Sequence, residues 1–272
     1  MIRVVSHGKQ LRRGAYSLHS KFASAVNFSC GNDFAFVVAM NTGAGPLNIV
    51  LQGMRLDSLN SLEIDNDSIC LNGIRFAFSS STLFDPRIEI YGYDQDNFKR
   101  NLKTFEQALV AFSQPASLAF LLDETRKGNF TSSFDIEYVR RFESAYRTFF
   151  PNTYLRGIEM VKGLGPGLTP SGDDFISGLL IALNVRQAAF RIDLSQTIHS
   201  IYQIAQGTNP FTNAFLRCAA RGEVSEKFKR LIGSLFHSER KEIIESTQRL
   251  LIVGATSGAD QAVGFLIGLK RF

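Results

Sequence analysis

The order of apolar and polar residues divides the chain into a β-rich part and a helical part. Between about residues 22 and 92, short apolar runs that suit β-strands alternate with turn residues. Residues 34–40 and 47–51 predict two strands joined by a glycine-containing loop. The Asn72-Gly73 pair between two apolar runs predicts a tight hairpin. We therefore expect an antiparallel sheet or a small barrel in the N-terminal third.

The spacing of apolar residues becomes helical after Pro86. Residues 102–112 and 136–149 repeat apolar side chains every three or four positions, which predicts two amphipathic helices. Further helix start and stop signals follow at residues 208–210, 221–222 and 238–239. The predicted fold class is α+β, with an N-terminal antiparallel β-rich domain over residues 1–95 and an α-helical domain over residues 96–272.

Composition excludes several classes of protein. The 272 residues are 44% apolar and 20% charged, as in ordinary globular chains. The net charge of +5 is scattered, and the chain has no tryptophan, so nucleic-acid binding is the least favoured function. No apolar run approaches the roughly 18 residues that span a membrane, and no secretory signal begins the chain. We expect no nucleic-acid partner and no membrane association.

The three cysteines, Cys30, Cys70 and Cys218, lie far apart and form no C-x-x-C pair. This number and spacing predict neither a disulfide framework nor a zinc site, and they favour the reducing cytoplasm. The four histidines show no metal-binding spacing, and no G-x-S-x-G serine motif occurs.

Residues 162–183 carry the strongest chemical signal. Glycines alternate through the first part of this segment, two prolines interrupt it, and the residues from Phe175 onward are apolar and helical. The pattern predicts a structured loop that leads into a helix N-terminus. Ser171 is the expected N-cap, and Asp173 and Asp174 fall in the first turn, where the helix dipole favours carboxylates.

Two interpretations of this loop remain open. A well-capped helix explains Ser171 and one aspartate, but the second carboxylate and the excess of glycines favour a loop that approaches a ligand. Gly167 and Gly172 have the glycine spacing of a phosphate loop, yet Asp173-Asp174 follow where such a loop has Lys and Ser or Thr. A phosphate would therefore contact only glycine amides or be bridged by Mg²⁺.

A second segment, residues 254–267, repeats the frame Ser-Gly-x-Asp-x-x-x-Gly. Its four matching positions, in order, are Ser257, Gly258, Asp260 and Gly264, which correspond to Ser171, Gly172, Asp174 and Gly178. We hypothesise a pseudo-repeat in which two helix N-termini converge and the last glycine of each frame permits close packing. Asp174 and Asp260 would face one site as Mg²⁺ ligands, as acceptors for a substrate amide or as bases. Chance similarity between two glycine-rich helix starts is the alternative.

The candidate site combines both segments. Its predicted catalytic residues are Asp173, Asp174 and Asp260, and the last two are also the predicted metal ligands. The predicted substrate-binding residues are Gly163, Gly165, Gly167, Thr169, Ser171, Gly172, Thr256, Ser257, Gly258 and Arg217. Arg217 would bind an anion, although a solvent-facing arginine on a helix is the more common interpretation.

Residues 163–174, 215–222 and 254–260 together resemble a bacterial family whose members are often described as carboxylases, and within it the AllH subunit of oxamate carbamoyltransferase. The resemblance implies a subunit of an assembly in allantoin breakdown. That assembly interconverts oxalurate and phosphate with oxamate and carbamoyl phosphate. It also implies a small anionic substrate and other carbamoyltransferase subunits as partners. A noncatalytic interaction subunit, or an enzyme acting on another small carboxylate, are the alternatives.

Overall fold

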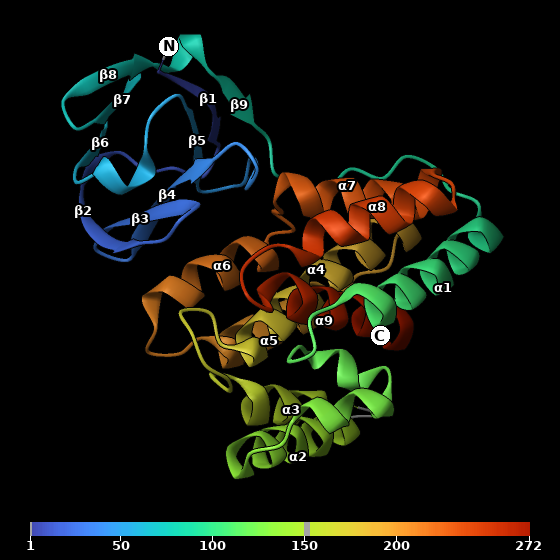
Figure 1. The fold of residues 1–272 in the computed structure, drawn as a ribbon. Helices are drawn as coiled ribbons and strands as arrows, with labels where there is room; N and C mark the ends of the chain where they lie inside the picture. The colour runs from blue at the N-terminus through green and yellow to red at the C-terminus, as the bar shows by residue number, and fades with distance from the viewer. Residues whose placement is uncertain (1, 150–152) are drawn as a thin grey trace. The chain divides into compact units, whose positions relative to one another are not determined.

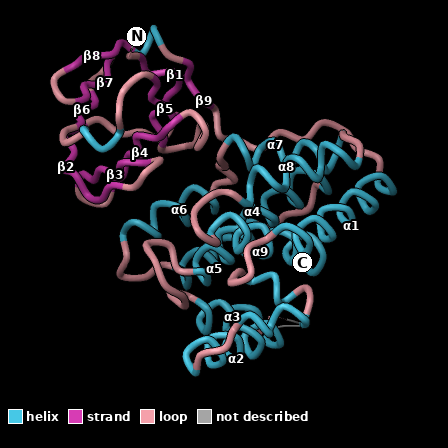
Figure 2. Tube along the Cα trace, in the orientation of Figure 1, coloured by secondary structure: helices cyan, strands magenta, loops and turns pink. Residues whose placement is uncertain are grey.

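The computed structural model describes residues 2–149 and 153–272. Strands occupy the early part of the chain and helices the later part, so the predicted α+β fold class is confirmed (Figure 1 and Figure 2). Among the described helices, none is both long enough and apolar enough to cross a membrane.

The chain forms two compact units, and the first unit is discontinuous in sequence. It runs to Arg87 and also contains Glu223–Lys227, which we call the late segment. The second unit comprises Ile88–Gly222 and Phe228–Phe272. The chain therefore leaves the helical unit once, contributes a short piece to the β-rich unit, and returns.

The first unit is a curled nine-stranded sheet in the described residues, ordered β8-β7-β6-β2-β3-β4-β5-β1-β9. Its strands are β1 (Arg3–Gly8), β2 (Gly14–Lys21), β3 (Ala25–Cys30), β4 (Asp33–Ala39), β5 (Asn48–Gln52), β6 (Leu62–Ile64), β7 (Ser68–Leu71), β8 (Ile74–Ala77) and β9 (Thr82–Phe84). The two runs predicted before and after the glycine loop are β4 and β5. The sequence pattern missed β1 and β2, because β2 buries only Tyr16 fully and has no continuous apolar run.

The sheet is mixed rather than purely antiparallel. β4 pairs with β5 in parallel, and β1 pairs with β9 in parallel, whereas the other pairs are antiparallel. Hydrogen bonds fix the loop between β4 and β5 so that β5 runs in the same direction as β4. Asn48 Nδ2 donates to Gly43 O at 2.9 Å, and the Ala44 amide donates to Glu226 Oε2 at 3.0 Å. A glycine-containing loop between two apolar runs does not reveal this direction.

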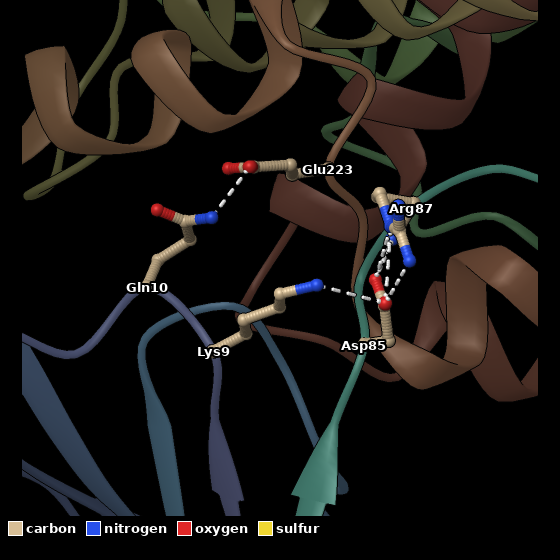
Figure 3. Close-up of polar contacts among 5 residues, drawn as sticks. All are labelled: Lys9, Gln10, Asp85, Arg87 and Glu223. Atoms are coloured by element: carbon tan, nitrogen blue, oxygen red, sulfur yellow. Dashed lines mark hydrogen bonds and ion pairs between the residues drawn. The ribbon is translucent and has the colours of Figure 1, made fainter.

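The late segment completes the first unit through polar contacts (Figure 3). Gln10 Nε2 donates to Glu223 Oε1 at 2.6 Å. Beside this bond, Asp85 accepts from Lys9 Nζ at 3.1 Å and from Arg87 Nη2 at 2.6 Å. The charged groups of Arg87 and Lys9 lower the pKa of Asp85 well below its usual range. These partners are far apart in sequence, so only the tertiary structure brings them together.

The Asn72-Gly73 turn joins β7 and β8 as predicted, with φ angles of 49° and 83°. Both angles are positive, as a type I′ turn requires. A Gly73→Ala variant is expected to lose about 1 kcal/mol of unfolding free energy from backbone strain alone, because nothing lies within 4 Å of the added methyl group. Urea denaturation would measure this loss. Gly128→Ala adds the same methyl group into open space without a positive φ, and an equal loss there would contradict the explanation.

The second unit is helical. Its helices are α1 (Gln95–Phe112), α2 (Ser133–Thr148), α3 (Tyr154–Val161), α4 (Ser171–Phe190), α5 (Ser195–Ala205), α6 (Pro210–Ala220), α7 (Glu226–His237), α8 (Arg240–Leu251) and α9 (Ser257–Arg271), and the first two residues of α7 belong to the late segment. The helices predicted from apolar spacing are α1 and α2. α4 and α9 run side by side through the middle of this unit (Figure 1) and pack on each other extensively. Both are buried around most of their circumference, which is typical of central helices.

Candidate functional site

The two glycine and aspartate motifs converge where α4 and α9 begin. Thr169 Oγ1, just before α4, lies 3.0 Å from Ser257 Oγ, the first residue of α9. One turn further on, Gln261 Nε2 donates to Ser177 Oγ at 2.9 Å. The predicted convergence of two helix N-termini is therefore confirmed.

The last glycine of each motif allows this convergence. A Cβ atom at Gly178 would lie 1.9 Å from Gln261 O, and one at Gly264 would lie 2.0 Å from Phe175 O. These two contacts are equivalent, because Phe175 and Gln261 occupy the same position of the repeated frame. The matching contacts support a pseudo-twofold relation between the two helices, and the predicted role of both glycines in close packing is confirmed.

The first glycine of each motif packs against the preceding helix. A Cβ at Gly172 would lie 1.7 Å from Val161 O at the end of α3, and one at Gly258 would lie 2.1 Å from Leu250 O near the end of α8. Close approach of the chain to itself thus accounts for both glycines. Their predicted contact with a substrate stays a prediction.

The loop before α4 depends on glycine for its shape. Gly163, Gly165 and Gly167 have φ angles of 70°, 119° and 98°, which side chains rarely adopt. Asp173 Oδ1 accepts a hydrogen bond from the Gly163 amide at 2.8 Å and so ties the loop to the helix. The amides of Gly165 and Gly167 find no acceptor among the described residues.

The prediction that Ser171 caps α4 is wrong. Pro170 is the N-cap, Ser171 is the first helical residue, and no side chain caps this end. The reason is that Pro170 already has the extended backbone of a cap, with φ −57° and ψ 145°. The Ser171 hydroxyl instead favours the ionised forms of Asp260 and Tyr138.

The side chains of Asp174 and Asp260 are buried. Asp174 is 8% exposed and Asp260 is fully buried. Asp260 Oδ1 accepts a hydrogen bond from the Leu118 amide at 2.7 Å. The second oxygen, Oδ2, of each carboxylate is buried without a hydrogen-bond partner in the described part of the chain. Such atoms are costly and therefore call for an explanation.

The protonation of the two aspartates reflects their burial. Burial raises the pKa of Asp260 to about 6, and the Leu118 amide lowers it only in part. Burial, and then the charge of Asp260, raises the pKa of Asp174 well above its usual range, against the effect of the Ser257 and Thr169 hydroxyls. Burial also raises the pKa of Asp173, although its bond to Gly163 opposes this shift.

A serine hydroxyl of each motif lowers the pKa of the aspartate in the other motif. Ser257 of the second motif acts on Asp174 of the first, and Ser171 of the first motif acts on Asp260 of the second. Thr256 also stabilises the Asp260 carboxylate. The serine of each motif thus opposes the raised pKa of the aspartate in the other motif, which agrees with the pseudo-twofold relation.

Tyr138 on α2 is a site residue that the sequence did not reveal. Its side chain is nearly buried, and burial followed by the charge of Asp260 raises the pKa of its hydroxyl. The phenol therefore keeps its proton and can donate a hydrogen bond near Ser171. Its only signal in the sequence is a place in the apolar pattern of an amphipathic helix, which does not distinguish it from a core residue.

Arg217 lies on α6, which packs against α4. The N-terminus of α6 contacts the glycine loop, because Asn209 Nδ2 donates to Leu168 O at 3.0 Å and Thr212 Oγ1 donates to the same oxygen at 3.3 Å. Arg217 is half-buried further along this helix. Its role in anion binding stays a prediction.

The described residues contain no group of three or more His, Cys, Asp or Glu side chains that could hold a metal ion. A cation at this site would therefore rest on the two aspartates, with hydroxyl oxygens and water as further ligands. Oxygen ligands of this kind suit Mg²⁺, which commonly binds one or two carboxylates and keeps several waters.

One known family matches the part of the chain that contains the candidate site. Residues 161–269 match the family described as oxamate carbamoyltransferase subunit AllH. This AllH-like region begins at the end of α3 and contains both motifs, α6 and nearly all of α9. The resemblance to AllH is thereby confirmed over this region, which is less than half of the chain. No solved structure matches the chain.

Proposed function

We propose that this protein is a subunit of an oxamate carbamoyltransferase and that the paired motifs bind its substrate. The observation that carries the proposal is the match of residues 161–269 to AllH, since this region includes every predicted catalytic residue. Burial of Asp174 and Asp260 at two converging helix starts supports the same site, because perturbed carboxylates gather where chemistry occurs.

The proposed substrate site has an accessible outer layer. Gly163 and Gly167 are exposed, and Thr169, Thr256 and Ser257 are half-buried. The amides of Gly165 and Gly167 are available to phosphate or carboxylate oxygens, as in other glycine loops at helix N-termini. The three hydroxyls would complete the contacts with a small anion such as phosphate, carbamoyl phosphate or oxamate.

In the proposed reaction, oxalurate and phosphate give oxamate and carbamoyl phosphate. A phosphate oxygen attacks the carbamoyl carbon, whose bond to the amide nitrogen breaks. The proton of the attacking phosphate moves to that nitrogen, so that atoms and charge balance. The glycine amides would hold the anionic groups, the hydroxyls would orient the carbamoyl group, and the Tyr138 phenol would donate to a substrate oxygen.

Calorimetric titration with oxamate, carbamoyl phosphate and phosphate tests the binding part. We expect Thr169→Val and Ser257→Ala each to weaken binding of at least one of these ligands about threefold to tenfold, which is the usual worth of one hydrogen bond. Thr131→Val removes an exposed hydroxyl elsewhere in the same unit and is the matched control. Equal affinities in all three variants would contradict the proposed site.

Phosphorolysis of oxalurate tests the enzymatic part. The chain is assayed with the other carbamoyltransferase subunits of its organism, with and without the two site variants. An assembly that forms carbamoyl phosphate at the same rate without this chain would refute the role as a required subunit.

A noncatalytic interaction subunit is the second candidate. Two hydrogen bonds favour it, because they give site aspartates a structural role. Asp173 accepts from the Gly163 amide, and Asp260 accepts from the Leu118 amide. Such a subunit would bind its partner chains but none of the three ligands, which the same titration distinguishes.

A further inference from the structure

A hollow in the second unit lies outside the paired motifs. It is about 650 Å³ in volume and is bounded by α1 and by the chain that connects α7 to α8. The neighbouring helices α1 and α8 pack side by side (Figure 1). The volume falls within the range of sites for small molecules. None of the residues that line the hollow belongs to the candidate functional site.

Basic side chains dominate the charge of this hollow. Arg100 and Lys103 on α1 and Arg240 at the start of α8 line it, together with one carboxylate, that of Glu239. In the part of the chain that the structure describes, none of these three cations forms an ion pair. A recess lined mainly by one sign of charge concentrates ligands of the opposite sign. The hollow therefore favours an anion.

The two carboxylates of α1 are engaged with other cations. Glu106 Oε2 accepts from Lys270 Nζ at 2.6 Å, and Asp96 Oδ1 lies 4.0 Å from Lys99 Nζ. The cations of the hollow thus have no counter-charge from their own helix.

The protein's own hydrogen bonds hold the hollow in shape. Asn101 Nδ2, on α1, donates to Leu235 O at 3.1 Å and to Ser238 O at 3.2 Å. This one side chain fixes the end of α7 and the residues after it against α1. A site formed in advance loses less conformational freedom on binding, so more of the interaction energy appears as affinity.

Backbone amides at the start of α8 border the basic side chains. Glu239 is the N-cap of this helix, but its side chain accepts no hydrogen bond from the first turn. The amides of Arg240 and Lys241 find no acceptor among the described residues. Such amides add donors for an oxyanion that the basic side chains attract.

We propose that this hollow binds a small phosphorylated molecule through its phosphate group. The two arginines suit this group, because a guanidinium donates to two phosphate oxygens at once. A phosphate monoester carries about two negative charges near neutral pH, which the three cations and one carboxylate of the lining balance. The amide side chains of Asn97 and Gln107, which also line the hollow, would contact the rest of the molecule. The proposal does not rest on the oxamate carbamoyltransferase function, because it uses no residue of the paired motifs.

Calorimetric titration of the purified chain tests the site, with ATP, tripolyphosphate and ribose 5-phosphate as separate probes and a chelator present. We expect at least one of them to bind as one molecule per chain, with an affinity that decreases as salt increases. Ribose 5-phosphate presents a single phosphate. Comparison of ATP with tripolyphosphate separates the contacts of the nucleoside from those of the phosphates.

Variants of the lining residues locate the bound probe. Arg100→Gln and Arg240→Gln should each weaken binding about tenfold or more, which is the lower end of the usual worth of a hydrogen bond to a charged group. Both side chains are exposed, so we expect both variants to keep the unfolding midpoint of the wild type. Lys241→Gln removes the same charge from the next residue of α8, outside the lining, and should stay within about twofold.

Three results would overturn the proposal. The first is absence of binding by all three probes at roughly 5 mM, a concentration above the dissociation constants of weak specific sites. The second is equal weakening by Lys241→Gln, which would indicate attraction to a basic surface in place of a site. The third concerns the paired motifs, which are themselves proposed to bind phosphate. Thr169→Val should leave the affinity for the probe unchanged, and a loss in this variant with none in Arg100→Gln or Arg240→Gln would assign the phosphate to the paired motifs.

Discussion

A Gly178→Ala variant is expected to lose about 3 kcal/mol or more of unfolding free energy, at the upper end of the usual cost of overpacking. The added methyl group would lie 1.9 Å from the carbonyl oxygen of Gln261 and 2.8 Å from the amide nitrogen of Phe265. Both are backbone atoms of α9, so no side chain can move aside. The two central helices would have to separate, and the motifs at their N-termini would separate with them.

Gly264→Ala should have the same effect, because its methyl group would meet the equivalent carbonyl of Phe175 at 2.0 Å. Urea denaturation of both variants measures the loss. Gly233→Ala, within α7, is the matched control, since nothing lies within 4 Å of its added methyl group. We expect this control to gain about 0.5–1 kcal/mol, as glycine replacement in a helix usually does. Loss of equal size in the control would show that the close approach of α4 and α9 is not the cause.

The cation-free protein is expected to lose stability as the pH rises from about 4 toward neutral, because of its buried aspartates. The pKa of Asp260 is about 6 in the folded protein against 3.8 for an ordinary aspartate, and burial raises the pKa of Asp174 well above its usual range. A group with a raised folded-state pKa stabilises the fold fully below its unfolded pKa. This contribution disappears as the pH passes the folded-state value, at about 1.4 kcal/mol per pH unit for each group.

Comparison of Asp260→Asn with the wild type isolates this contribution from other titrating groups. Denaturation is measured in the presence of a chelator at intervals from pH 4.5 to 8. The unfolding free energy of the variant should increase relative to that of the wild type as the pH increases. The asparagine oxygen still accepts from the Leu118 amide, so the fold keeps that bond. Asp96→Asn, at an exposed position of α1, should follow the wild type at every pH. Parallel curves for Asp260→Asn and the wild type would contradict the raised pKa.

The arrangement of the two motifs was predictable from local patterns. Alternating glycines, prolines and adjacent aspartates indicated a loop before a helix, and the repeated frame indicated that Asp174 and Asp260 belong together. Backbone rules acting within a few residues explain this success, because positive φ angles require glycine and a proline stops a helix. The prediction that Ser171 caps α4 was wrong for a related reason. The identity of an N-cap depends on the backbone angles of Pro170, which residue preferences do not determine.

What the sequence alone determined is the division into strands and helices, the turn at Asn72-Gly73, and the two motifs. These features arise from contacts between neighbours in the chain. Only the tertiary structure decided the parallel pairing of β4 with β5, the place of the late segment in the first unit, and the presence of Tyr138 beside the aspartates. The physical reason is that these depend on burial and on contacts between residues far apart in sequence, where many arrangements satisfy the same local pattern.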